Sequence, residues 1–322
     1  MKATKFILSF FLCILFLASC KKEVTSNEGV NPPKVKDLNN FKIIGSEGSD
    51  LNQFNFGSSN YDMPWMMATD GNYVYVGDYE NYCVKKVDIS SGQVVGWYGY
   101  KGSIWGYYTT ATVLPDPTFK PYRLIYKDNK IYAFSHVYGI SKSVIYEFDI
   151  TSNSLISKTR TINEYTLYAV TMDDNKNVFV AKGNELIKYE LNGTIKVFGG
   201  PGIEDGKLST QGYTCQLLID RDTLIVLDAG NSRIQKFNTN GDFLSSFPVN
   251  TNNNFWSFCI EDHKYYLMEN SNLSEYTSNG MKSGMWIFLN SPQYFNTFGK
   301  QILKVKDKFV IQQSNFMRLV VY

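Results

Sequence analysis

The chain has 322 residues, of which 43% are hydrophobic, 16% aromatic and 19% charged. That composition supports a large core, and the 23 Tyr and 22 Phe favour strands over helices. The 32 basic and 30 acidic side chains almost cancel, so the chain lacks the basic excess of a nucleic-acid-binding protein, and no such partner is expected.

The first residues are typical of an export signal. Lys2 and Lys5 precede an apolar run over 6–17, which is too short to cross a bilayer as a helix. Residues 17–20, Leu-Ala-Ser-Cys, resemble the lipobox of bacterial lipoproteins, in which the cysteine is acylated and becomes the first mature residue. We expect a signal peptide over 1–19 and a lipid anchor on Cys20 that attaches the protein to a membrane. An ordinary secretory signal with a chance cysteine is the alternative.

Residues 20–40 are predicted to form a flexible tether. They are polar, contain Asn31-Pro32-Pro33 and have almost no apolar content, so they cannot bury enough surface to become ordered. Fully extended, this segment would reach roughly 65 Å from the membrane. The folded domain is then expected over 41–322.

One pattern of strands and turns recurs along this domain. Its clearest copy, 213–247, predicts a strand that ends at Asp220 and strands at 223–227, 233–238 and 242–247, which together make one blade of a β-propeller. The second strands of the six copies mark the phase, and each follows a turn with Asp: 73–76, 131–134, 178–180, 224–227, 265–268 and 309–311. A repeat of about 40 to 50 residues indicates a propeller or solenoid.

The outer strands keep the same phase. The predicted third strands are 84–88, 144–149, 186–190, 233–238, 273–277 and 316–322, and the predicted fourth strands are 94–99, 155–160, 194–199, 242–247 and 285–289. The sixth copy has no fourth strand, but 41–45 is an unassigned strand before the first copy. An incomplete blade would leave an exposed edge. The prediction is therefore an all-β, six-bladed propeller of four-stranded blades, with the N-terminal strand closing the last blade.

Two stretches carry a family resemblance. Residues 44–48, Met63-Pro64 and 70–78 resemble the consensus of NHL-repeat propellers, and 227–237 (LDAGNSRIQKF) resembles it more closely. The resemblance covers about 41–322 but is specific only in the first and fourth copies. It implies the fold and no particular activity. Similar lipoproteins of Gram-negative bacteria imply an outer-membrane address, facing either the periplasm or the cell surface.

In such a propeller, the loops between second and third strands and the loops between blades share one face, which we call the loop face. Two groups of aromatic residues are candidate ligand-binding sites on this face. The longest insertion, 100–121, carries Trp105, Tyr107, Tyr108 and Phe119 and follows Trp97 and Tyr98; its rings could stack on sugars or anchor a protein partner, or fold over their own blade. The second group lies near the starts of innermost strands and comprises Trp65, Tyr122, Tyr168, Tyr213 and Trp256. These residues would surround the mouth of a central channel, unless they pack between blades.

Catalytic chemistry has weaker support. The two histidines, His136 in a predicted loop and His263 in a predicted turn, lie on different edges of their blades and cannot build the multi-histidine site that some lyases use on this fold. No cofactor is predicted, with a calcium site of Asp, Asn and Glu as the alternative. Cys83, Cys215 and Cys259 are expected to be small buried hydrophobic residues, although a bridge between Cys215 and Cys259 is geometrically conceivable.

Together these features predict a lipid-anchored envelope propeller that binds a protein or glycan partner through its loop face. The alternative is a lyase or lactonase with a metal-assisted site in the central channel.

Overall fold

The computed structural model describes residues 34–37, 40–56, 66–99, 119–137, 142–152, 154–163, 169–209, 216–249, 255–269, 272–287, 299–313 and 317–322, and at some strand ends only the backbone. Contacts divide the chain into residues 1–32 and 33–322, and every described residue belongs to the second unit. Within these residues, no helix is long and apolar enough to cross a membrane.

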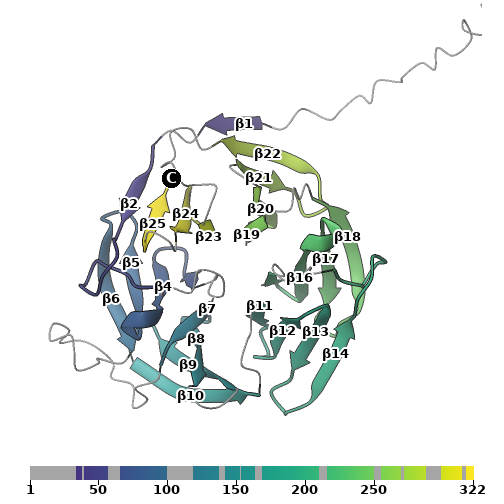
Figure 1. Cartoon of the computed structure of the whole chain (residues 1–322), viewed down its shortest axis with the longest axis horizontal. Helices are drawn as coiled ribbons and strands as arrows, with labels where there is room; N and C mark the ends of the chain where they lie inside the picture. The colour runs from purple at the N-terminus through teal and green to yellow at the C-terminus, as the bar shows by residue number, and fades with distance from the viewer. Residues whose placement is uncertain are drawn as a thin grey trace, which may run out of the picture. The chain divides into compact units, whose positions relative to one another are not determined.

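The described residues form six sheets, as the sequence predicts, and within each blade the four successive strands are antiparallel (Figure 1). Blades one to three consist of β3 (Met67–Thr69), β4 (Val74–Asp78), β5 (Cys83–Asp88) and β6 (Gln93–Gly99); β7 (Pro121–Lys127), β8 (Lys130–Val137), β9 (Lys142–Asp149) and β10 (Ser154–Ile162); and β11 (Ala169–Met172), β12 (Val178–Lys182), β13 (Glu185–Tyr189) and β14 (Ile195–Gly199).

Blades four to six complete the set. They consist of β15 (Leu217–Asp220), β16 (Thr223–Asp228), β17 (Arg233–Asn238) and β18 (Phe243–Pro248); β19 (Phe255–Glu261), β20 (Lys264–Glu269), β21 (Asn272–Tyr276) and β22 (Lys282–Ile287); and β23 (Gly299–Val305), β24 (Lys308–Gln313), β25 (Arg318–Val321) and β2 (Lys42–Ile44). Strand β17 has the predicted bounds, and every predicted second, third and fourth strand overlaps an observed one.

The innermost strands close the ring. Each of β3, β7, β11, β15, β19 and β23 contacts the innermost strand of the next blade, and β23 contacts β3. Figure 1 shows these strands around the centre, with the fourth strands at the periphery. The fold class is therefore a six-bladed β-propeller.

The N-terminal strand completes blade six, which confirms the closure prediction. Strand β2 pairs antiparallel with β25, with Ile44 opposite Leu319. Ile44 is 2% exposed and belongs to the same core cluster as Leu319, so this strand contributes apolar burial as well as backbone hydrogen bonds. Sheet six would otherwise end at β25 with an open edge.

A further strand, β1 (Lys34–Asp37), lies within the residues expected to form the tether. It pairs in parallel with β22 and extends blade five to five strands. Lys34, Val35 and Lys36 are all exposed, and Nζ of Lys36 lies 5.6 Å from the centroid of the Trp286 ring. Composition did not predict this strand, because it is held by backbone pairing with β22 rather than by burial of its side chains.

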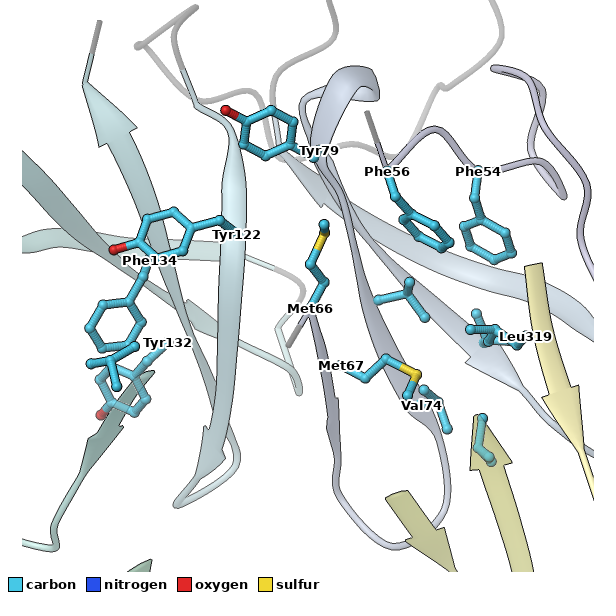
Figure 2. Packing of buried hydrophobic residues seen from close by; sticks show 14 of the residues in the cluster. Phe54, Phe56, Met66, Met67, Val74, Tyr79, Tyr122, Tyr132, Phe134 and Leu319 are labelled. Atoms are coloured by element: carbon cyan, nitrogen blue, oxygen red, sulfur yellow. The ribbon is translucent and has the colours of Figure 1, made fainter. Parts of the chain in front are cut away.

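The core lies between neighbouring blades, where aromatic rings fill the space between the sheets. Tyr98 of blade one and Phe119 both contact Phe148 of blade two, and the ring of Phe119 lies 4.9 Å from that of Tyr146. Blades five and six meet in the same way through Trp286 and Phe309. Figure 2 shows another part of the core, built from residues of blades one, two and six. Many of the aromatic residues in the sequence thus pack between neighbouring blades.

Closure by β2 can be tested by truncation. A chain that begins at residue 47 loses β2, and we expect its free energy of unfolding to fall by roughly 3 kcal/mol or more, since Ile44 burial and the pairing with β25 are both lost. Urea denaturation followed by fluorescence measures the change.

The matched control begins at residue 40 and loses only β1. Its exposed side chains bury little apolar area, so the loss should stay below about 1 kcal/mol. Equal stability of the two truncated chains would contradict the closing role of β2.

Candidate functional site

The loops between second and third strands form short turns in blades one and four. They are the 3-10 helices η1 (Tyr79–Asn81) and η2 (Ala229–Asn231). Each is followed by a residue in the left-handed region, Tyr82 at φ 57° and Ser232 at φ 53°. Each of these turns is preceded by a fully buried aspartate, Asp78 in blade one and Asp228 in blade four.

Asp228 joins its turn to the loop that enters blade four. Its carboxylate accepts hydrogen bonds from the backbone N–H of Ser209 at 2.8 Å, and from the side chains of Asn231 at 2.9 Å, Arg233 at 2.8 Å and Gln235 at 2.9 Å. A buried carboxylate is costly unless it is paired and hydrogen-bonded, and Asp228 has both kinds of partner. Its oxygens are therefore occupied in holding local structure.

The same network fixes the loop over 199–209. The Arg233 guanidinium donates to the carbonyl oxygens of Glu204 at 2.7 Å and Lys207 at 2.8 Å, and Asn231 donates to that of Gly202 at 2.9 Å. Ile203, between these anchored positions, is 77% exposed. These hydrogen bonds thus hold the loop against its blade, and the apolar side chain of Ile203 is exposed to solvent.

Asp78 plays the same part in blade one. It accepts hydrogen bonds from the backbone N–H of Asn55 at 2.6 Å and from Asn81 at 2.9 Å, and it pairs with Lys85 at 2.7 Å. Burial raises the pKa of Asp78, and Lys85 and the two amide donors oppose that effect. Lys85 also donates to the carbonyl oxygen of Gln53 at 2.5 Å.

The loops entering blades one and four have matching geometry. Isolated parallel bridges join Glu47 to Phe54 and Pro201 to Leu208. Asn81 donates to the carbonyl oxygen of Gly48, as Asn231 does to that of Gly202. Leu51, in the first of these loops, is 40% exposed. Sequence reasoning did not assign these roles, although the shared Asp-x-x-Asn spacing at 78–81 and 228–231 is a signal that could have found them.

Most sequence-predicted site residues lie outside the described part of the structure. These are Cys20, Trp65, Trp105, Tyr107, Tyr108, Tyr168 and Tyr213. For Trp256 only the backbone, in β19, is described. Their proposed roles stay predictions.

In the second group of aromatic candidates, Tyr122 has a described side chain, and it is 5% exposed. Its hydroxyl donates to Oγ of Ser143 at 2.9 Å, and its ring belongs to the core cluster shown in Figure 2, beside Phe134. Burial raises the pKa of its hydroxyl. Phe119, at the end of the predicted insertion, is also fully buried. Phe119 thus packs on rings of its own blade, and Tyr122 lies in a core cluster shared by several blades, which are the alternatives to ligand binding given above for the two groups.

The histidines and cysteines have structural surroundings where they are described. His263 is in an exposed turn, with Nδ1 3.3 Å from Oδ2 of Asp220, whereas the side chain of His136 is not described. Cys83 and Cys259 are buried free thiols, and burial raises the pKa of both. Cys215 lies outside the described residues. Over the described ranges, no group of three or more His, Cys, Asp or Glu side chains could hold a metal ion.

A second set of polar contacts joins the innermost strands around the ring. Gln216 of blade four accepts from the N–H of Phe258 at 2.7 Å and donates to the carbonyl oxygen of Phe258 at 2.9 Å. Gln301 of blade six does the same to Met67 of blade one, at 2.6 and 2.8 Å. Each glutamine thus satisfies both backbone groups of one residue on the next blade. We call such a contact a clasp.

Two further clasps use other side chains. Oγ of Ser257 in blade five accepts from the N–H of Ile302 in blade six at 3.2 Å. Nε of Arg123 in blade two donates to the carbonyl oxygen of Val170 in blade three at 3.1 Å. All four clasp residues are at most 5% exposed.

The four clasp residues occupy one position in the repeat. In each blade, the residue that directly follows the clasp residue pairs with the same position of the second strand. These partners on the second strands are Ala133, Val226, Leu267 and Ile311. In blades one and three the same position holds Met66 and Ala169. The residue whose backbone is bonded by the clasp directly follows the equivalent of the clasp position in the next blade.

Comparison with solved structures identifies the fold. The chain is similar to a protein of unknown function from Bacteroides thetaiotaomicron, at 12% identity and a TM-score of 0.53, over 88% of this chain and 76% of that chain. It is also similar to a streptogramin B lyase, at 12% identity and a TM-score of 0.51, over 88% of this chain and 96% of that chain. No protein-family model matches the sequence, and no curated protein matches it. Likeness at such identities shows the propeller fold alone.

The role of the buried aspartate can be tested at Asp228. Replacing it by alanine removes the buried partner of Arg233, and we expect the free energy of unfolding to fall by about 3 to 5 kcal/mol. Trypsin should then cut after Lys207 in the native protein, because the 199–209 loop is released. Urea denaturation and limited proteolysis provide the two measurements.

Asp205→Asn is the matched control, since Asp205 is exposed and pairs with the same arginine at 3.4 Å. Its loss should cost no more than about 1 kcal/mol. If the two variants have the same stability and cleavage rate, Asp228 does not hold the loop.

Proposed function

We propose that this protein is a lipid-anchored propeller of the bacterial outer membrane, related to NHL-repeat propellers, which binds a protein or glycan partner through its loop face. The observation that supports the proposal is the pair of anchored loops over 45–56 and 199–209. Each is held by a buried aspartate and presents an exposed apolar side chain, Leu51 or Ile203. A loop that is already ordered loses little conformational entropy when a partner binds.

The two buried carboxylates that hold these loops are not available as catalytic groups. A general acid or base needs a carboxyl group that can reach a substrate. Asp78 and Asp228 are fully buried and engaged with neighbouring donors. Trp105, Tyr107 and Tyr108 of the predicted insertion over 100–121, together with Trp65 and Trp256, are the proposed aromatic anchors, because large rings supply contact area at low entropy cost.

The partner-binding surface can be tested with Leu51→Ser combined with Ile203→Ser. We expect at least about tenfold weaker binding of a partner identified by screening glycans and purified envelope proteins, because two exposed anchors are lost. Surface plasmon resonance with the purified domain measures the affinity.

Leu191→Ser combined with Ile195→Ser is the matched control, since both residues are exposed at β14 or the turn before it. A partner that binds all three proteins equally does not use the anchored loops. Metal analysis of the same samples tests the lyase or lactonase alternative. One tightly bound metal ion per chain, with a lower melting temperature in chelator, would favour that enzyme.

The lipid anchor can be tested with Cys20→Ser. The variant lacks the acylated thiol and should move from the membrane fraction to the soluble envelope fraction, since one modified residue supplies the whole attachment. Cys83→Ser, which changes a buried thiol, is the control and should remain with the membrane. Membrane retention of the Cys20 variant would contradict the anchor.

A further inference from the structure

The arginine clasp differs from the two glutamine clasps in its charge. Arg123 is 5% exposed on the innermost strand of blade two, and its Nη1 has no hydrogen-bond partner. Among the described residues, no carboxylate forms an ion pair with it. Burial lowers the pKa of this guanidinium to about 10, so it remains a cation at neutral pH. A buried cation without a counter-charge is costly.

The clasp itself does not require a positive charge. Gln216, Ser257 and Gln301 occupy the same repeat position and join their blades with neutral side chains. Closure of the ring therefore does not explain why residue 123 carries a positive charge.

Arginine also leaves half of the clasp unfilled. A glutamine offers one acceptor and one donor, and Gln216 and Gln301 use both on the next blade. Arginine has donors only, so Arg123 bonds the carbonyl oxygen of Val170 and offers no acceptor to its N–H. Val170 holds the same register position as Met67 and Phe258, whose N–H groups point to the clasp. Two donors, Nη1 of Arg123 and the N–H of Val170, thus lie at one junction.

We propose that the junction of blades two and three binds an oxyanion, a carboxylate or phosphate group, between Arg123 and Val170. One negatively charged oxygen takes the place of the amide oxygen of the glutamine clasps, and it neutralises the guanidinium. Arginine suits such groups because its planar donors match their oxygens. The junction borders the centre of the ring, where β7 and β11 are neighbours (Figure 1). This site is separate from the anchored loops of the proposed function.

Arg123→Gln is the variant that isolates the charge. It installs the residue found at this position in blades four and six, so the junction can close with two neutral hydrogen bonds. We expect this variant to melt at a higher temperature than the wild type when no oxyanion is present. The wild type should gain roughly 2 to 4 °C in 20 mM acetate, phosphate or sulfate over chloride at equal ionic strength, and Arg123→Gln should gain nothing.

The probes identify the class of oxyanion. A response to acetate alone indicates a carboxylate ligand, and a response to phosphate and sulfate alone indicates a phosphate-type ligand. Arg221→Gln, in an exposed turn, controls for general ionic effects and should respond like the wild type. The proposal is overturned if the wild type shows no response, or if wild type and Arg123→Gln respond equally.

A second measurement covers the case in which Arg123→Gln does not fold. Isothermal titration of acetate, phosphate and sulfate into the wild type should show one saturable site per chain. Arg123→Lys keeps the charge but loses the planar pair of donors, and its affinity should fall about tenfold. Absence of saturable binding in the wild type, or equal affinity of the two proteins, contradicts the site.

Discussion

Each innermost strand of this propeller has one edge that no strand of its own sheet covers. Backbone N–H and carbonyl groups on such an edge need partners when they are buried. At four junctions between described strands, a side chain from the neighbouring blade bonds one or both of these groups, always from the same position in the repeat. The ring is thus joined at its centre by hydrogen bonds, and between the sheets by aromatic packing.

The outer edges of blades five and six are covered by strands from the N-terminal part of the chain. Blade six receives its fourth strand from the other end of the chain, through β2 and the buried Ile44. Blade five receives the short strand β1, which buries little and pairs through its backbone. Closure by β2 links the two ends of the domain, so the stability of the whole ring depends on a strand that lies far from its partner in sequence.

Two ion pairs that contain a fully buried aspartate hold loops against their blades. The pairs Asp78–Lys85 and Asp228–Arg233 lie under loops of the same geometry, in the two repeats that most resemble the NHL consensus. In both repeats these pairs hold a loop against its blade. Arg123 differs from these residues, because no described carboxylate forms an ion pair with it and its Nη1 has no hydrogen-bond partner.

The sequence alone determined the propeller, the phase of its six blades and the closing strand, because alternating apolar residues and Asp or Asn turns act over a few neighbouring positions. Strand β17 at Arg233–Asn238 is an example, predicted to the residue. Only the tertiary structure decided which polar side chains meet. A glutamine or arginine in a strand looks the same whether it faces water or the next blade, and the contact between Arg123 and Val170 exists only because the ring brings two repeats together.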